Sequence, residues 1–222
     1  MPQILSLFNS FWYCGLETVN KRKVFDMTVG VDHKYIPENA AKGDTPGPRP
    51  DVRTTYCEVM QMGACRLDAD GNEVGVLNLT IKAHRIRTIP SWLQKMTGMT
   101  EERREREGVD FTEAIIRLSG FVGICETPWT FNGDWFVLKG NAEAHGIALP
   151  FPQPFQRVKP RLVDWGVTLE DYQRHGFTEV NSGNLHAVLG IKLLAIEGVG
   201  AHDALHDARS LTHSVHYLTK GQ

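Results

Sequence analysis

The chain has 222 residues, of which 41% are hydrophobic and 23% are charged, a composition typical of a globular domain that buries a substantial core. Its 24 basic and 26 acidic residues leave a formal net charge of −2, which excludes a uniformly basic surface and restricts any nucleic-acid binding to local patches. The spacing of the four cysteines excludes a CxxC zinc ribbon, and no apolar run or signal-peptide pattern points to a membrane, so a cytoplasmic protein is expected.

The first predicted strand covers residues 24–29, a short β-branched and aromatic run. Alternation along a strand places Asp26 and Thr28 on the same face. A proline- and glycine-rich connection at 36–54 follows, and connections of this length inside a domain are usually functional or disordered. The predicted organisation is therefore an N-terminal extension at 1–22 and one domain over 23–222.

The next predicted elements are strands at 58–67 and 74–82 around an Asp-Gly hairpin signal, and a helix at 91–96 that Gly98 ends. The charged run 101–107 is expected to be a solvated turn or short helix. Later elements are a helix at 111–122, a buried strand at 129–131, and helices at 135–145, 169–175, 184–189 and about 203–218. This order predicts an α/β fold with a mixed sheet flanked by helices.

Several ionisable residues lie at unusual places in this pattern. Asp26 is inside an apolar strand, where burying an unpaired carboxylate is costly. Asp134 follows a strand and begins a helix, and on its own it has the simpler interpretation of a helix N-cap. Asp207 lies beside the apolar stripe of the last helix, five positions after His202. Carboxylates on separate core elements suit hard divalent cations.

Together these residues resemble the DnaQ-like 3′→5′ exonucleases of the DEDDh type. Within that family the resemblance is nearest to the branch of KapD-like proteins and histone-mRNA 3′-end exoribonucleases, and it extends over residues 24–218. It rests on Val24-Phe25-Asp26-Met27-Thr28 as the Asp-x-Glu motif, the strand Glu58-Val59-Met60-Gln61-Met62-Gly63-Ala64, Met96-Thr97-Gly98-Met99-Thr100, Asn132-Gly133-Asp134-Trp135, and Ala201-His202-Asp203-Ala204-Leu205-His206-Asp207-Ala208-Arg209 as His-x-Ala-x-x-Asp-Ala.

The resemblance implies a ribonuclease H-like fold and a metal-dependent 3′→5′ exonuclease. The implied metal ligands are Asp26, Thr28, Asp134 and Asp207, holding two Mg²⁺ or Mn²⁺ ions. His202 would take a proton from the attacking water, so that the implied catalytic residues are Asp26, Asp134, His202 and Asp207. The implied substrate is the 3′ end of a single-stranded nucleic acid, with RNA favoured over DNA, and the product is a nucleoside 5′-monophosphate.

The sequence departs from the family pattern at Thr28, where the family has Glu. A hydroxyl binds a hard cation more weakly than a carboxylate does, and Asp32 and Glu58 are the nearby acids that could compensate. The departure leaves two hypotheses, a weakened enzyme or a catalytically silent module that binds nucleic acid or a partner. A third hypothesis is a zinc site formed by His202 and His206, which have the spacing of a HExxH motif with Asp203 in place of Glu.

Overall fold

The structure is a computed structural model that describes residues 27–40, 47, 51–123, 127–151 and 154–220. Within this part of the chain, five strands form one mixed sheet in the order β3-β2-β1-β4-β5. Strands β1, β2 and β3 form an antiparallel meander, while β4 and β5 continue the sheet parallel to β1. The strands are β1 (Thr28–Pro37), β2 (Cys57–Leu67), β3 (Glu73–Thr80), β4 (Trp129–Thr130) and β5 (Gln156–Arg157).

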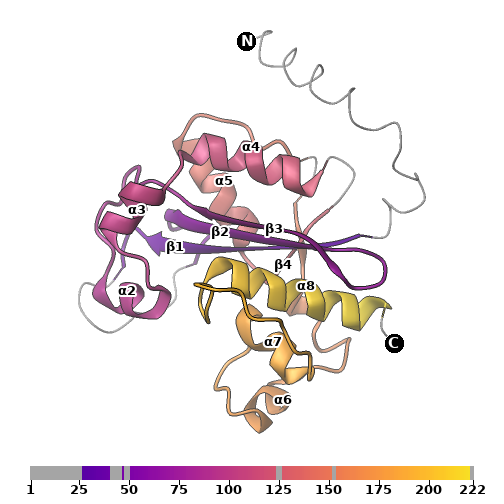
Figure 1. Cartoon of the computed structure of the whole chain (residues 1–222). Helices are drawn as coiled ribbons and strands as arrows, with labels where there is room; N and C mark the ends of the chain where they lie inside the picture. Colours follow the sequence, from indigo (N-terminus) through magenta and orange to yellow (C-terminus); the bar gives the residue numbers. More distant parts are fainter. Residues whose placement is uncertain (1–26, 41–46, 48–50, 124–126, 152–153, 221–222) are drawn as a thin grey trace, which may run out of the picture.

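Helices cover both faces of this sheet, which confirms the predicted α/β class (Figure 1). Helices α4 and α5 lie on one face, and α8 lies across the other face with α7 and α6 beyond it. The helical segments are α2 (Ser91–Thr97), α3 (Glu101–Glu107), α4 (Phe111–Val122), α5 (Asp134–Ala144), the 3₁₀ helix η2 (Lys159–Arg161), α6 (Leu169–Arg174), α7 (Ser182–Val188) and α8 (Ala204–Lys220).

Strand β1 differs from its prediction in its bounds. Residues 24–26 and the predicted extension at 1–22 lie outside the described residues, and the strand runs past Val29 to Pro37. Polar residues after Val29 hid this continuation, because they break the apolar pattern of a buried strand. Pairing with β2 keeps them in the strand, with Asp32 opposite Gly63, so tertiary contacts override the local preference.

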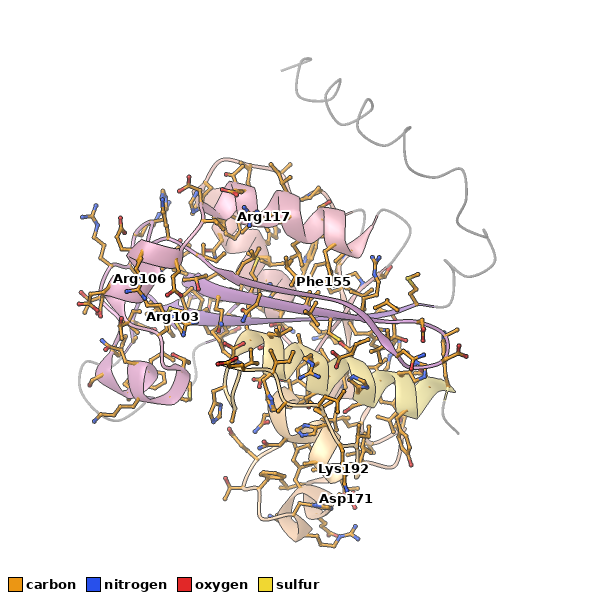
Figure 2. All side chains as sticks on the ribbon, viewed as in Figure 1. Arg103, Arg106, Arg117, Phe155, Asp171 and Lys192 are labelled. Atoms are coloured by element: carbon orange, nitrogen blue, oxygen red, sulfur yellow. The ribbon has the colours of Figure 1, made fainter. Side chains whose placement is uncertain are left out.

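Two hydrophobic clusters hold the helical layers to the sheet. One joins the sheet to α4 and α5, and the other lies around α8 and the helices beyond it. Figure 2 contrasts Phe155, which is buried in the first cluster, with Arg106, which is exposed on α3. The predicted apolar stripe of the last helix is confirmed as buried; its members are Ala204, Ala208, Leu211, Val215 and Leu218.

Helix α8 lies very close to β1 and β2 because two glycines face it. A Cβ at Gly30 would lie 3.1 Å from the carbonyl oxygen of Ala208 and would clash with Thr212. A Cβ at Gly63 would clash with the backbone of Ala204. Glycine therefore permits a backbone approach that any side chain would prevent, and this approach brings the first turn of α8 against the middle of the sheet.

The charged segment 101–107 forms helix α3, but its prediction as a solvated segment was wrong for Arg104. The Arg104 side chain is 1% exposed and donates through Nη2 to Oε1 of Glu58 at 2.7 Å. The Glu58 carboxylate also accepts the amides of residues 84–86. A charged side chain can be buried when it is paired and fully hydrogen-bonded. The partner of Arg104 is Glu58, which is distant in sequence.

Within the described residues, no helix combines the length and the apolar character that crossing a bilayer requires.

Candidate active site

Three carboxylates from separate elements lie near one another at the start of α8, two of them bridged by Lys34. Asp32 lies in β1, Asp134 is the first residue of α5, and Asp207 lies in the first turn of α8. They are 5%, 9% and 5% exposed, respectively. Burial raises the pKa of Asp32 from its ordinary 3.8 to about 7, and the nearby charges of Asp207 and Asp134 act in the same direction against the opposing effect of Lys34. The sheet and two helices thus hold like charges together away from water.

The side chain of Lys34 lies between two of these carboxylates. Its Nζ donates to Oδ2 of Asp32 at 2.9 Å and to Oδ2 of Asp207 at 2.5 Å. Burial opposes the charge on Lys34, but the two carboxylates outweigh burial and raise its pKa above the ordinary 10.5. Lys34 is therefore an ammonium ion fixed inside the acidic cluster.

The start of α7 closes the cluster from the side opposite the sheet. Oγ of Ser182 donates to Oδ1 of Asp32 at 3.2 Å. A Cβ at Gly183 would lie 3.0 Å from Cγ of Asp207 and closer still to its Oδ1. That Oδ1 is buried and has no hydrogen-bond partner among the described residues. One oxygen of Asp207 is thus held by Lys34, while the other is left without a partner in a buried place.

Asp134 has a histidine as its partner. Nδ1 of His33 lies 3.2 Å from Oδ1 of Asp134, and the His33 side chain is fully buried. The N-cap of α5 is Gly133, so the interpretation of Asp134 as the helix N-cap was wrong. Its negative charge at the first helical position is favoured by the helix dipole, and His33 orients the carboxylate from the sheet.

Asp203, which is not one of the three clustered carboxylates, fixes the beginning of α8. Asp203 accepts hydrogen bonds from Nε2 of Gln61 at 2.6 Å and from Nδ2 of Asn78 at 3.3 Å. Its Oδ1 also accepts the backbone N–H of Leu205 at 2.8 Å, as an N-cap side chain does. Gln61 Oε1 in turn accepts the N–H of Ala204. These bonds tie the helix start to β2 and β3 and thereby position Asp207.

His202 lies on the turn that leads into α8. It is exposed, and its φ of 67° is the only positive φ of a non-glycine residue among the described residues. A side chain in this left-handed conformation costs about 1–2 kcal/mol. Such backbone strain is found at functional sites more than elsewhere, which makes His202 a candidate for more than a structural role.

The structure describes only part of the first predicted motif. Asp26 lies outside the described residues, and Thr28 is buried at the start of β1, opposite Leu67. The strand places Asp32 and Lys34 beside Asp207, six positions after Asp26 and Thr28. Of the two acids considered as compensation, Asp32 is in the cluster, while Glu58 is bonded to Arg104 elsewhere.

Sequence reasoning missed Lys34 as a site residue. The available signal was the same-face spacing of Asp32 and Lys34 in an Asp-x-Lys triplet, two residues apart as in an Asp-x-Glu motif. It was overlooked because Asp26 and Thr28 offered the same spacing in a more apolar run.

The zinc hypothesis fails on geometry. It requires His202 and His206 on one face of a helix, but α8 begins at Ala204, after His202. His206 instead makes a ring contact with His186, at 5.4 Å between centroids.

A different trio has metal-ligand atoms close together, namely Cys65, Glu73 and His213. However, Oε1 of Glu73 is already bound by Nη2 of Arg209 at 2.7 Å and by Nε2 of His213 at 2.8 Å. A guanidinium on the same oxygen repels a metal cation. Glu73 is therefore engaged in an ion pair with Arg209, and the trio does not have the character of a metal site.

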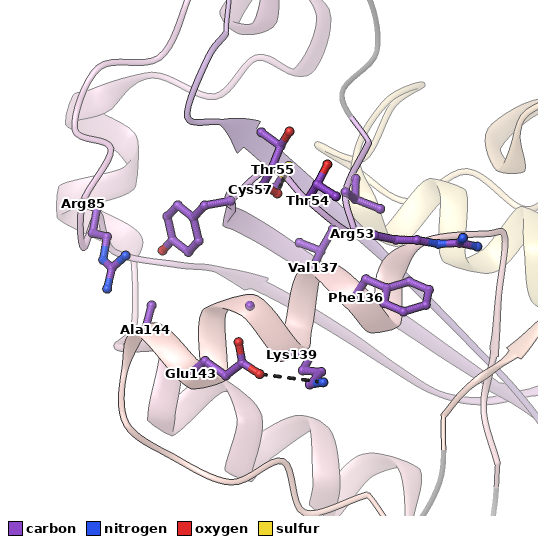
Figure 3. A pocket seen from close by; sticks show the side chains of 13 residues that line it. Arg53, Thr54, Thr55, Cys57, Arg85, Phe136, Val137, Lys139, Glu143 and Ala144 are labelled. Atoms are coloured by element: carbon purple, nitrogen blue, oxygen red, sulfur yellow. Dashed lines mark hydrogen bonds and ion pairs between the residues drawn. The ribbon is translucent and has the colours of Figure 1, made fainter.

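A cavity of about 420 Å³ lies between residues 52–57 and α5 (Figure 3). Its cations already have partners in the protein. The Arg53 guanidinium lies 5.2 Å from the centroid of the Phe136 ring, and Lys139 pairs with Glu143 at 3.8 Å. None of the three clustered carboxylates lines it, so the cavity lies beside the candidate active site and is not part of it.

No protein-family profile matches the chain, and no curated protein matches it by sequence. Solved structures do match. The nuclease domain of 3′hExo, a DEDDh family member, bound to rAMP, aligns with a TM-score of 0.62 at 12% identity over 88% of this chain and 92% of that one. A 3′-exonuclease structure that describes 3′-end specific recognition of the histone mRNA stem-loop gives 0.66 at 11% identity, over 88% and 82%.

A third match is E. coli exonuclease I in complex with a dA16 oligonucleotide. Its TM-score is 0.56 at 16% identity, and the alignment covers 87% of this chain but 41% of the longer exonuclease I. The chain has the fold of the DEDDh exonucleases. The predicted DnaQ-like, ribonuclease H-like fold is therefore confirmed, and at these identities the likeness concerns the fold alone.

In this exonuclease fold, the donor set can be compared with what a metal ion needs. Hard divalent cations prefer carboxylate oxygens, and the cluster offers them from Asp32, Asp134 and Asp207. The unpartnered Oδ1 of Asp207 is buried where an oxygen without a partner is costly. The donor set therefore suits a hard divalent cation in its chemistry, with one oxygen of Asp207 held by Lys34 and the other unpartnered beside Gly183.

Proposed function

We propose that the chain is a divalent-metal-dependent 3′→5′ exonuclease that shortens single-stranded nucleic acid and releases nucleoside 5′-monophosphates. The observation that carries the proposal is the gathering of Asp32, Asp134 and Asp207 from three elements into one buried cluster. Keeping like charges together costs stability, and folds retain such an arrangement where a site uses it. The unpartnered oxygen of Asp207 supports a cation at this place.

The chain's own residues have distinct roles in this proposal. Asp32, Asp134 and Asp207 would hold the cation, Mg²⁺ or Mn²⁺, which supplies Lewis-acid polarisation of the phosphate and a more acidic water. The imidazole of His202, on the turn just before the helical turn that carries Asp207, takes the proton from the attacking water. The ammonium of Lys34 stabilises the negative charge that develops on the phosphate oxygens.

We propose RNA as the preferred substrate. Support comes from the structures with the same fold, since one is bound to rAMP and another describes recognition of the histone mRNA stem-loop. A fold match at 11–12% identity does not fix substrate, so RNA and DNA strands of the same sequence must be compared directly.

The test is incubation of 5′-labelled single strands of RNA and DNA with the full chain and Mg²⁺ or Mn²⁺. The expected result is a ladder that shortens from the 3′ end, with release of nucleoside 5′-monophosphates and faster loss of RNA. Asp207→Asn is the matched inactive variant, because it keeps the shape of the side chain and removes its charge. If neither metal produces mononucleotides from either strand, the exonuclease proposal is wrong.

One observation favours a second candidate function, a catalytically silent module that binds a nucleic-acid 3′ end. Lys34 occupies the space between two carboxylates that a cation would otherwise share, and a site filled by a lysine can bind a phosphate without cleaving it. Fluorescence anisotropy of the same labelled strands separates the two. Binding that weakens in Lys34→Met, with no product from the wild type, supports the silent module.

A further inference from the structure

The charge of the acidic cluster suggests how many cations it can hold. Asp32, Asp134 and Asp207 each carry one formal negative charge, and Lys34, which contacts both Asp32 and Asp207, carries one formal positive charge. Two negative charges therefore remain, which one divalent cation neutralises. A buried cluster is most stable when its charges are compensated, because uncompensated charge is expensive away from water.

The geometry of the hydrogen bonds divides the cluster into two sides. Nζ of Lys34 holds Oδ2 of both Asp32 and Asp207, at 2.9 Å and 2.5 Å. The opposite oxygens face away from the ammonium, with Oδ1 of Asp32 near Ser182 and Oδ1 of Asp207 without a partner. One side is thus occupied by a cation of the protein itself, and on the other side Oδ1 of Asp207 is the carboxylate oxygen that still lacks a partner among the described residues.

We infer that Lys34 is a built-in cation of the acidic cluster, and that the cluster accordingly holds one divalent ion and not two. The inference deepens the proposed function, because it concerns the same site and rests on its carboxylates as metal ligands. Lys34 cannot easily move aside for a second ion. Its side chain is 15% exposed, and leaving would break two charge-assisted hydrogen bonds, which are among the stronger ones in proteins.

The experiment counts ions directly. Isothermal titration calorimetry and Mn²⁺ electron paramagnetic resonance on the full chain measure the number of ions bound and their affinity without reference to hydrolysis. The wild type is expected to bind one Mn²⁺ per chain. Lys34→Glu, which gives the cluster a fourth carboxylate, is expected to bind two. Lys34→Met removes the ammonium without adding an acid, and its single ion should bind roughly tenfold or more tightly.

Lys139→Glu is the matched control, since it makes the same charge change at a position that is 60% exposed on α5. It should bind one ion with the affinity of the wild type. Thermal melting in EDTA and in Mn²⁺ reports whether each variant is folded. If Lys34→Glu does not fold in EDTA or in Mn²⁺, the affinity of Lys34→Met decides the matter.

Two ions of similar affinity in the wild type, or no Mn²⁺ at all, would overturn the inference. So would a folded Lys34→Glu with one ion, or Lys34→Met with unchanged affinity. Failure of the proposed function has a different signature. One ion per chain without mononucleotide release contradicts the exonuclease proposal and leaves the inference standing, whereas two ions with release contradict the inference alone.

Discussion

Gly183 in α7 lies directly against the carboxylate of Asp207, so that a single added methyl group would collide with an oxygen of the candidate active site. The φ of Gly183 is not positive, so the backbone itself tolerates alanine. The space occupied by Asp207 is the reason for glycine here. Helix α7 and the first turn of α8 are consequently coupled through the one carboxylate whose Oδ1 is unpartnered.

Gly183→Ala should therefore lower stability and disturb the site together. Overpacking of this kind costs about 1–3 kcal/mol, and a displaced Asp207 should also reduce Mn²⁺ affinity and nucleotide release. Urea unfolding and Mn²⁺ titration measure the two effects. Gly120→Ala is the control, because it is a helical glycine with no atom within 4 Å of the added Cβ, and it should raise stability by about 0.5–1 kcal/mol. Equal stability of the two variants would refute the coupling.

Asp203 and Asp207 should respond differently to the same substitution. Asp207→Asn should reduce nucleotide release by roughly 10²–10³-fold, because it removes a charge at the reacting centre, while the chain stays folded. Asp203→Asn should keep activity within a few fold below its melting temperature and lose about 1–2 kcal/mol of stability, since Asp203 caps α8 and accepts from Gln61 and Asn78. Melting curves and initial rates for both variants check this. A larger rate loss in Asp203→Asn than in Asp207→Asn would reverse the assignment.

How much of the fold and of the candidate site could be predicted depends on whether each feature follows from local sequence or from contacts between distant segments. The apolar stripe of α8 and the strand at β2 follow from periodicity, which local sequence records. Asp134 and Asp207 were named in advance because each begins or interrupts a regular element. Asp32 was considered only as an acid that could compensate for Thr28, because its place in β1 depends on pairing with Gly63 that no local pattern reveals. Lys34 was missed because its place beside Asp207 also depends on tertiary contacts that no local pattern reveals.

The buried pair of Glu58 and Arg104 should contribute to stability far from the acidic cluster. Arg104→Met leaves the carboxylate of Glu58 buried without its charged partner, and breaking such a pair costs about 3–5 kcal/mol. Chemical unfolding of Arg104→Met measures the loss, and Arg106→Met is the control because Arg106 is 70% exposed. Equal stability of the two variants would show that the buried pair is dispensable.

The same pair predicts a pH dependence. Burial opposes the charge on Glu58, but hydrogen bonds from the amides of Ile86, Arg85 and His84 and from Arg104 outweigh burial and hold its pKa below the ordinary 4.5. The folded chain therefore releases this proton more readily than the unfolded chain. The stabilisation is complete above pH 4.5 and is lost as the pH falls through the lower folded pKa. The unfolding free energy of Glu58→Gln should accordingly show a shallower acid slope than the wild type, and identical slopes would contradict this.

His202 should show opposite effects on stability and activity. Glycine adopts a φ of 67° without the steric cost that any side chain incurs. His202→Gly should therefore be more stable than His202→Ala by about 1 kcal/mol, since alanine keeps the left-handed strain. Both should release nucleotides about 10²–10⁴-fold more slowly, because both lack the group that takes the proton from water. Unfolding curves and initial rates with saturating Mn²⁺ measure the two quantities. If alanine and glycine are equally stable, the strain at this turn is absent, and if both variants keep full activity, the proton acceptor is another residue.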